Sequence, residues 1–125
     1  MLLIVSIRCY SQTFETDSNV MGTWNERTKK WEYEDKNYSD ITFTFENGVF
    51  SADDKAHSAY HIYDKGENEN DNLIRKLSFR DVSDDKGRKC YVMLHTRIKD
   101  NIQTIMIMYS DVVFTYFIKS SLSKF

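Results

Sequence analysis

The chain has 125 residues, the length of one domain and enough to bury a single hydrophobic core. Aromatic residues make up 14% of it, proline is absent and only 4 glycines occur, which excludes a linker or a low-complexity protein. The 17 basic and 19 acidic side chains are mixed along the chain and give a net charge of −2, without the basic stripe of a dedicated nucleic-acid binder.

The first residues form an apolar run that is followed by smaller side chains. Residues 2–7 are apolar but far too few to span a bilayer, and small residues just after them would suit signal-peptidase cleavage before Gln12. We therefore expect residues 1–12 to be a truncated signal peptide and residues 13–125 to form a single secreted or periplasmic domain. The alternative is an additional edge strand, in which case the protein would be cytoplasmic.

The first predicted strand, residues 20–25, contains a glycine two positions before a tryptophan. Alternate side chains of a strand lie on one face, so Gly22 leaves room beside the bulky indole of Trp24. We expect both residues to be structural, with the indole plugging the closed end of a barrel. Residues 13–19 are polar and are predicted to lead into this strand.

A first hairpin is predicted directly after this strand. A polar turn at residues 25–28 precedes an alternating segment, residues 29–34. Trp31 and Tyr33 lie on one face of that segment and charged side chains lie on the other.

A second hairpin has the clearest pattern in the chain. Apolar residues alternate with threonine and glutamate over residues 41–46, which predicts a half-buried strand. Asn47 and Gly48 follow it, and this pair favours a type I′ turn because both central residues of such a turn need a positive φ. Residues 49–52 are then the return strand.

The middle of the chain contains two predicted strands and one long loop. Residues 57–63 alternate and place Tyr60 on one face of a strand. Residues 64–72 contain no apolar side chain and are predicted to be a solvated loop. Residues 73–80 form the next predicted strand, with Leu73 on its apolar face.

The last third of the chain is the most apolar. It predicts three strands, at residues 89–96, 102–109 and 112–119, joined by tight turns. Residues 105–109 are apolar on both strand faces, so this strand is expected to be central or covered on both sides.

Taken together, these segments predict an all-β protein. Eight or nine short strands, mostly with short connections and without a helical stripe, favour an antiparallel up-and-down meander. Closing the meander into a small barrel removes edges that an apolar sheet would otherwise expose.

Within this strand pattern, Gly22-Thr23-Trp24 resembles the calycin group, which comprises lipocalins and avidin-like barrels. In lipocalins the Gly-x-Trp motif closes the bottom of the barrel, and an arginine near the end of the last strand packs on the tryptophan; this chain has Lys119 at that place. The resemblance implies a small lipocalin-like barrel that binds a small apolar molecule in its open mouth.

The residues that could carry catalysis or hold a metal are not grouped in the sequence. His57 and His61 share a strand face but are four residues apart, roughly 13 Å in an extended chain, too far to bind one ion. Cleavage would remove Cys9 and leave Cys90 in an apolar strand, where a small buried hydrophobe is expected. We therefore expect a protein that is not an enzyme, with no metal and no cofactor.

Aromatic side chains are the best candidates for a binding site. We predict that Trp31, Tyr33, Tyr60 and Tyr116 form the wall or mouth of a cavity that binds a small apolar ligand. A barrel of about eight strands can be filled by side chains or can hold one small ligand, and the many large residues favour a filled interior with a shallow mouth. The alternative function is a pocketless structural or protein-interaction module that packs residues 105–109 against a partner or a second copy.

Overall fold

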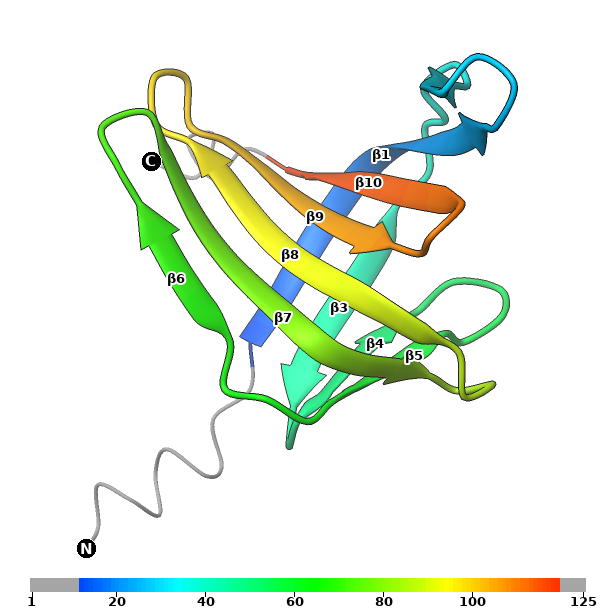
Figure 1. Ribbon diagram of the computed structural model, residues 1–125. Coiled ribbons are helices and arrows are strands. Elements are labelled where there is room, and N and C mark those ends of the chain that lie inside the picture. Colours follow the sequence, from blue (N-terminus) through cyan, green and yellow to red (C-terminus); the bar gives the residue numbers. More distant parts are fainter. Residues whose placement is uncertain (1–11, 120–125) are drawn as a thin grey trace, which may run out of the picture.

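The computed structural model describes residues 12–119, whose ten strands form one antiparallel sheet that closes into a barrel (Figure 1). In chain order the strands are β1 (Gln12–Asn25), β2 (Lys30–Tyr33), β3 (Ile41–Glu46), β4 (Val49–Ala52), β5 (Ala59–Ile62), β6 (Glu67–Asn70), β7 (Ile74–Asp84), β8 (Lys89–Arg97), β9 (Ile102–Met108) and β10 (Val112–Ile118). Eight of them form the ring β1-β3-β4-β5-β7-β8-β9-β10, which closes because β10 pairs with β1. The predicted up-and-down β-barrel is confirmed.

The connections between strands lie at two ends of the barrel. The turns after β4, β7 and β9, together with the β1–β3 connection that contains β2, lie at one end, which we call the mouth. The turns after β3 and β8 lie at the opposite end. Residues 12–119 contain no helix, and therefore no helix that could cross a membrane.

Aromatic and branched side chains fill the middle of the barrel. Phe43 and Phe50 stack with their ring centroids 5.1 Å apart, and Tyr116 meets Phe43 edge-on at 4.8 Å. Such ring pairs add to the stabilisation that comes from burying the rings. The buried cluster consists of Phe43, Phe50, Ala52, Tyr60, Phe79, Val82, Cys90, Val92, Ile105 and Ile107.

Local sequence rules correctly predict the β3–β4 hairpin. Asn47 and Gly48 have φ values of 54° and 75°, the positive values that a type I′ turn requires. Glu46 pairs with Val49 across the turn, which fixes the register that turns Phe43 and Phe50 inward.

β1 is longer than predicted, because it begins at Gln12 and includes the polar residues 13–19. The prediction that these residues only lead into the strand is wrong. Thr16 and Ser18 are buried, and the Thr16 hydroxyl donates a hydrogen bond of 2.7 Å to the carbonyl of Ile41. Small hydroxyl side chains that are satisfied in this way can be buried, although in a sequence they resemble loop residues. The remainder of the predicted signal peptide lies outside the described residues.

The prediction of a solvated loop for residues 64–72 is also wrong, because this segment contains β6. Its side chains are exposed, and the strand is held by antiparallel pairing with residues 75–78 of β7. Gly66, with a φ of 82°, passes so close to Phe79 that a β-carbon would lie 2.7 Å from its ring. Leu73, predicted on an apolar face, precedes β7 and is exposed.

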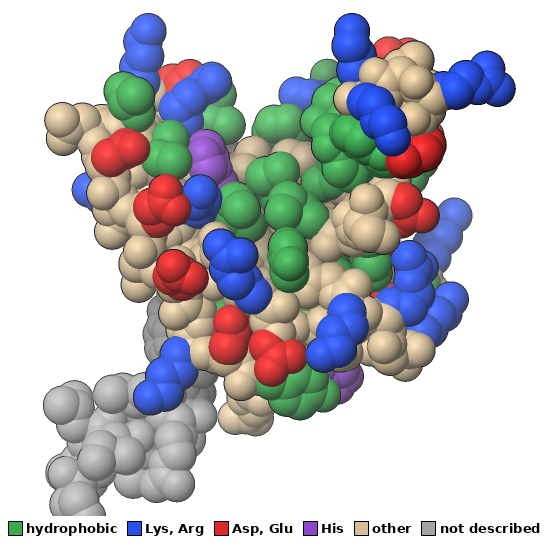
Figure 2. Space-filling model, viewed as in Figure 1, with side chains coloured by type: hydrophobic (Ala, Val, Ile, Leu, Met, Phe, Trp, Pro, Cys, Tyr) green, Lys and Arg blue, Asp and Glu red, His purple; other side chains and the backbone are tan. Residues whose placement is uncertain are grey.

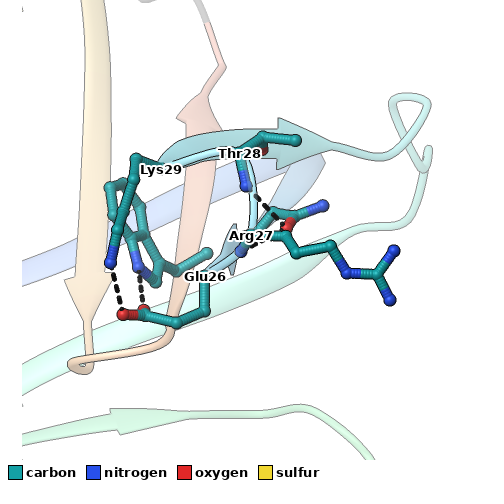
Figure 3. Close-up of polar contacts among 6 residues, drawn as sticks. Glu26, Arg27, Thr28 and Lys29 are labelled. Atoms are coloured by element: carbon teal, nitrogen blue, oxygen red, sulfur yellow. Dashed lines mark hydrogen bonds and ion pairs between the residues drawn. The ribbon is translucent and has the colours of Figure 1, made fainter.

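Trp24 does not plug the barrel. The Gly-x-Trp motif stands at the end of β1, at the mouth, and the half-buried indole lies outside the core cluster. The indole Nε1 donates a 2.6 Å hydrogen bond to Glu26, which also pairs with Lys29 at 2.8 Å in the β1–β2 turn (Figure 3). The ring of Trp31 meets Trp24 edge-on at 5.5 Å.

The space beside Gly22 is occupied by the ring of Tyr33 and not by the indole of Trp24. A β-carbon on Gly22 would lie 2.7 Å from the Tyr33 ring and 3.0 Å from Val113. Lys119 lies at the other end of β1, where its amide bonds to the carbonyl of Glu15. The lipocalin arrangement of glycine, tryptophan and a terminal cation is therefore not reproduced in this barrel.

The different surroundings of Phe43 and Trp24 predict different costs of truncation. Phe43→Ala should lower the free energy of unfolding by about 3–5 kcal/mol, because it leaves a cavity in the core. Trp24→Ala should cost about 1–2 kcal/mol, because the indole is only half-buried. Urea unfolding of both variants checks this, and equal losses would place the indole in the core after all.

Candidate functional site at the barrel mouth

The structure groups two of the four aromatic residues that were predicted to bind a ligand. Tyr60 on β5 and Tyr116 on β10 point into the barrel, where Tyr60 is part of the core and Tyr116 packs against it. Trp31 and Tyr33 lie on β2, outside the ring, and are exposed. The ligand-binding role of these residues stays a prediction.

A cavity of about 300 Å³ lies at the mouth, between the turns that follow β4, β7 and β9. Tyr60, Val112 and Phe114 give it an apolar wall. The other lining residues are Ala56, Ser58, Asp84, Asp85, Lys86, Arg88 and Tyr109, most of them polar or charged. A cavity of this size is at the lower end of the range for small-molecule sites.

Asp84 organises the polar side of the cavity. One carboxylate oxygen accepts hydrogen bonds from the amides of Lys86 (3.0 Å) and Arg88 (2.8 Å), and the other accepts the hydroxyl of Tyr109 at 2.7 Å. Burial by itself would raise the pKa of Asp84, but these hydrogen bonds and the nearby Arg88 charge lower it below its ordinary value. Asp84 is therefore ionised at neutral pH, with its oxygens already bonded within the chain.

Arg88 brings a positive charge to the same cavity. Its guanidinium lies over the ring of Tyr109, 4.4 Å from the ring centroid. The ion pairs within residues 12–119 do not include Arg88, whereas six other cations there have a carboxylate partner. The guanidinium is thus held by an aromatic face and can still donate hydrogen bonds to a bound molecule.

The three phenols near the cavity stay protonated at neutral pH. Burial, with a smaller effect from the charge of Asp54, raises the pKa of Tyr116 to about 12. Burial also raises the pKa of Tyr60, with Tyr116 adding to it, and the pKa of Tyr109, with the hydrogen bond to Asp84 adding to it. These hydroxyl groups can therefore serve as neutral donors and acceptors.

Cys90 lies in the core beneath this network as a free, buried thiol, as predicted. Burial and the charge of Asp84 raise its pKa to about 11, so the reactive thiolate is scarce at neutral pH. His57 is exposed in the β4–β5 turn, while His61 lies on β5. Among residues 12–119, no group of three or more His, Cys, Asp or Glu side chains is placed to hold a metal ion.

A wider hollow of about 570 Å³ lies beside the mouth, between residues 37–41 and 53–56. Its carboxylates order the backbone of the mouth. Asp53 accepts the amide of Thr42 at 2.7 Å, and Asp54 accepts both the amide and the hydroxyl of Ser58.

A third hollow, of about 290 Å³, lies on the outer wall of the barrel and not at the mouth. It is lined by His95, Arg97, Ile102, Thr104, Met106 and Phe117. Met106 points outward because its neighbours Ile105 and Ile107 are buried in the core. The strand predicted to be apolar on both faces is therefore covered by the core on one side and lies at the outer surface on the other.

The sequence did not single out Asp84, Arg88 or Tyr109 as site residues. The stretch from Asp84 to Gly87 has the composition of a turn, and a turn residue is not distinguishable from a site residue by local chemistry. Tyr109 follows β9 and is adjacent to Asp84 because β7, β8 and β9 are neighbours in the sheet.

Removing the Tyr109 hydroxyl should weaken the mouth in a pH-dependent way. Tyr109→Phe deletes one of three donors to Asp84, so at neutral pH we expect a loss of about 1–2 kcal/mol in unfolding free energy. Because the pKa of Asp84 is lowered in the fold, this stabilisation is present above the ordinary carboxyl pKa and is lost as pH falls through the lowered value. Urea unfolding of both proteins at about pH 7 and about pH 2 checks this. An equal difference at both pH values would mean that the hydroxyl acts through packing alone.

No protein-family model, no curated protein and no solved structure matches this chain. The functional proposal therefore rests on the geometry of the barrel and its cavities.

Proposed function

We propose that this protein is a non-enzymatic, lipocalin-like binding protein that holds a small ligand at the barrel mouth. The observation that carries the proposal is the cavity of about 300 Å³ with an apolar wall and a polar rim. The apolar body of the ligand would lie against Tyr60, Val112 and Phe114. Its polar end would meet Tyr109 and the guanidinium of Arg88.

The packing of the barrel limits how large this ligand is. Phe43, Phe50 and their neighbours fill the middle of the barrel, so the ligand occupies the mouth and not a deep interior chamber. The Gly-x-Trp motif stands at this same end of the barrel, so the location rests on the cavity and not on the lipocalin resemblance. Trp31 and Tyr33 stand outside the ring and would contact only the exposed part of such a ligand, if it extends that far.

Binding of simple amphiphiles tests this proposal. Decanol and decanoate should each bind the protein saturably at one site in isothermal titration calorimetry. Val112→Trp places an indole in the cavity and should weaken binding by at least about tenfold. Val49→Trp adds the same side chain on the outer surface at the opposite end and is the matched control. The proposal is contradicted if the unsubstituted protein shows no saturable binding, or if Val112→Trp and Val49→Trp bind the amphiphiles equally well.

We further propose that the protein is exported and that its leader is removed before Gln12. The support is the short apolar run at the start of the chain with small residues after it. Intact-mass analysis of the protein from its native source should then give a chain that begins at Gln12. A mature protein that retains residues 1–11 would contradict export by this route.

A second candidate function is protein interaction through the outer wall of the barrel. The observation that favours it is the outward-facing apolar side of β9, beside a hollow that contains no acidic residue. An apolar fluorophore should bind this wall in the intact protein and less well in Met106→Glu. Equal fluorescence in the two proteins would argue against an interaction surface here.

A further inference from the structure

The middle of the outer surface of four neighbouring strands is uncharged. Strand pairing aligns outward side chains from β8, β9, β10 and β1 in three rows, and their faces follow from the buried neighbours in each strand. The rows are His95-Thr104-Phe117-Ser18, then Met93-Met106-Thr115-Val20, then Tyr91-Met108-Val113-Gly22. We call these rows the outer apolar face. Figure 2 shows hydrophobic side chains gathered over these strands, with charged groups around them.

Such a face is unusual for a barrel surrounded by water. The exposed side of an antiparallel sheet normally carries polar or charged residues. Here no position in the three rows is Asp, Glu, Lys or Arg, and the middle row places Met93 beside Met106. Methionine is flexible and adapts to irregular apolar surfaces, which suits a contact surface.

Several cations at the edge of the face are already paired with carboxylates of the chain. Lys76 pairs with Glu69, Arg80 with Glu67 and Arg97 with Asp100. Lys36 keeps its charge and lies over the ring of Phe117, 4.3 Å from its centroid, at one end of the face. The middle of the face therefore offers no charge to attract an acidic or basic partner, and its best electrostatic match is another neutral face.

The face is also complementary in shape to itself. The hollow of about 290 Å³ lies at the end of the face that carries His95 and Phe117. At the other end project Tyr91 and Tyr33, whose ring covers Gly22. A two-fold axis along the middle row would set the tyrosines of one copy against the hollow of the other, as in an isologous interface.

The available area suits a weak, reversible dimer. Four strands and three rows, Tyr91 included, cover roughly 300 Å² of flat surface. Tyr33 and Trp31, which are 63% and 37% exposed, add roughly 200 Å² beside them. A standard interface buries roughly 800 Å² on each partner, so this face is of the smaller size that is typical of transient contacts.

From this geometry we infer that the outer apolar face binds a second copy of the same chain, in a two-fold dimer with Met106 at the axis. The inference names the partner for the second candidate function and is independent of ligand binding at the mouth. In the dimer the two Met106 side chains lie next to each other. A charge at that position would face its own copy across an apolar contact.

Sedimentation equilibrium over a range of protein concentrations tests the inference. The unsubstituted chain should show a reversible monomer–dimer equilibrium, and Met106→Glu should weaken it by at least about tenfold through like-charge repulsion. Thr44→Glu, which adds the same charge to the outer surface of β3, is the control and should leave the dimer intact. Circular dichroism melts confirm that both variants are folded.

A cross-linking variant keeps the inference testable if Met106→Glu does not fold. Met106→Cys should form an intermolecular disulfide under mild oxidation, above the level of the unsubstituted chain and of Thr44→Cys. A monomer at all concentrations, or equal cross-linking of the two cysteine variants, overturns the inference. If the monomer still binds the apolar fluorophore at this face, only the choice of partner is wrong; if it does not, the interaction function fails as well.

Discussion

The pairing of β1 with β10 is the interaction on which the rest of the structure depends. It joins the first and last strands over residues 16–23 and 112–118, and without it the sheet would be an open ribbon with two long edges. β1 can do this because its other edge is shared between β3 at its beginning and β2 at its end. The register shift between Thr16 and Ser18 lies where the pairing with β3 ends and that with β10 begins. Closure converts a meander of local hairpins into a barrel with an inside, an outside and two distinct ends.

The mouth gains its chemistry from the neighbouring strands β7, β8 and β9. Asp84 ends β7 and Tyr109 follows β9, yet the two share a 2.7 Å hydrogen bond in the structure. The carboxylate is occupied by three donors from its own chain, whereas the guanidinium of Arg88 is held on the ring of Tyr109 and can still donate hydrogen bonds in the cavity. A fixed polar group at the rim and an apolar wall below it are the two features that orient a small ligand.

The outside of the barrel has two unlike halves. The middle of the wall formed by β8, β9, β10 and β1 carries no charged side chain, whereas β6 presents only glutamate and asparagine to solvent. The aromatic pair of Trp24 and Trp31 belongs to the β2 hairpin beside this wall. The tryptophan that suggested a barrel plug is thus better understood as part of an external surface. The proposed ligand site and the proposed dimer surface lie on different parts of the molecule, so each can be tested without disturbing the other.

The sequence alone determined the fold class, because period-two alternation and Asn-Gly chemistry act over a few residues and need no tertiary contact. Sequence patterns also indicated that Tyr60, Tyr116 and Cys90 lie on strands, and the structure shows that their side chains point into the barrel. Tertiary structure decided what alternation cannot express: that polar residues 13–19 and 67–70 are strands, since their stability comes from backbone pairing with distant segments. It decided as well that Gly22 accommodates Tyr33 and not Trp24, and that Asp84, Arg88 and Tyr109 meet. Those contacts are set by the exact register of the β1–β2 hairpin and of the strands β7, β8 and β9, and alternation alone does not fix that register.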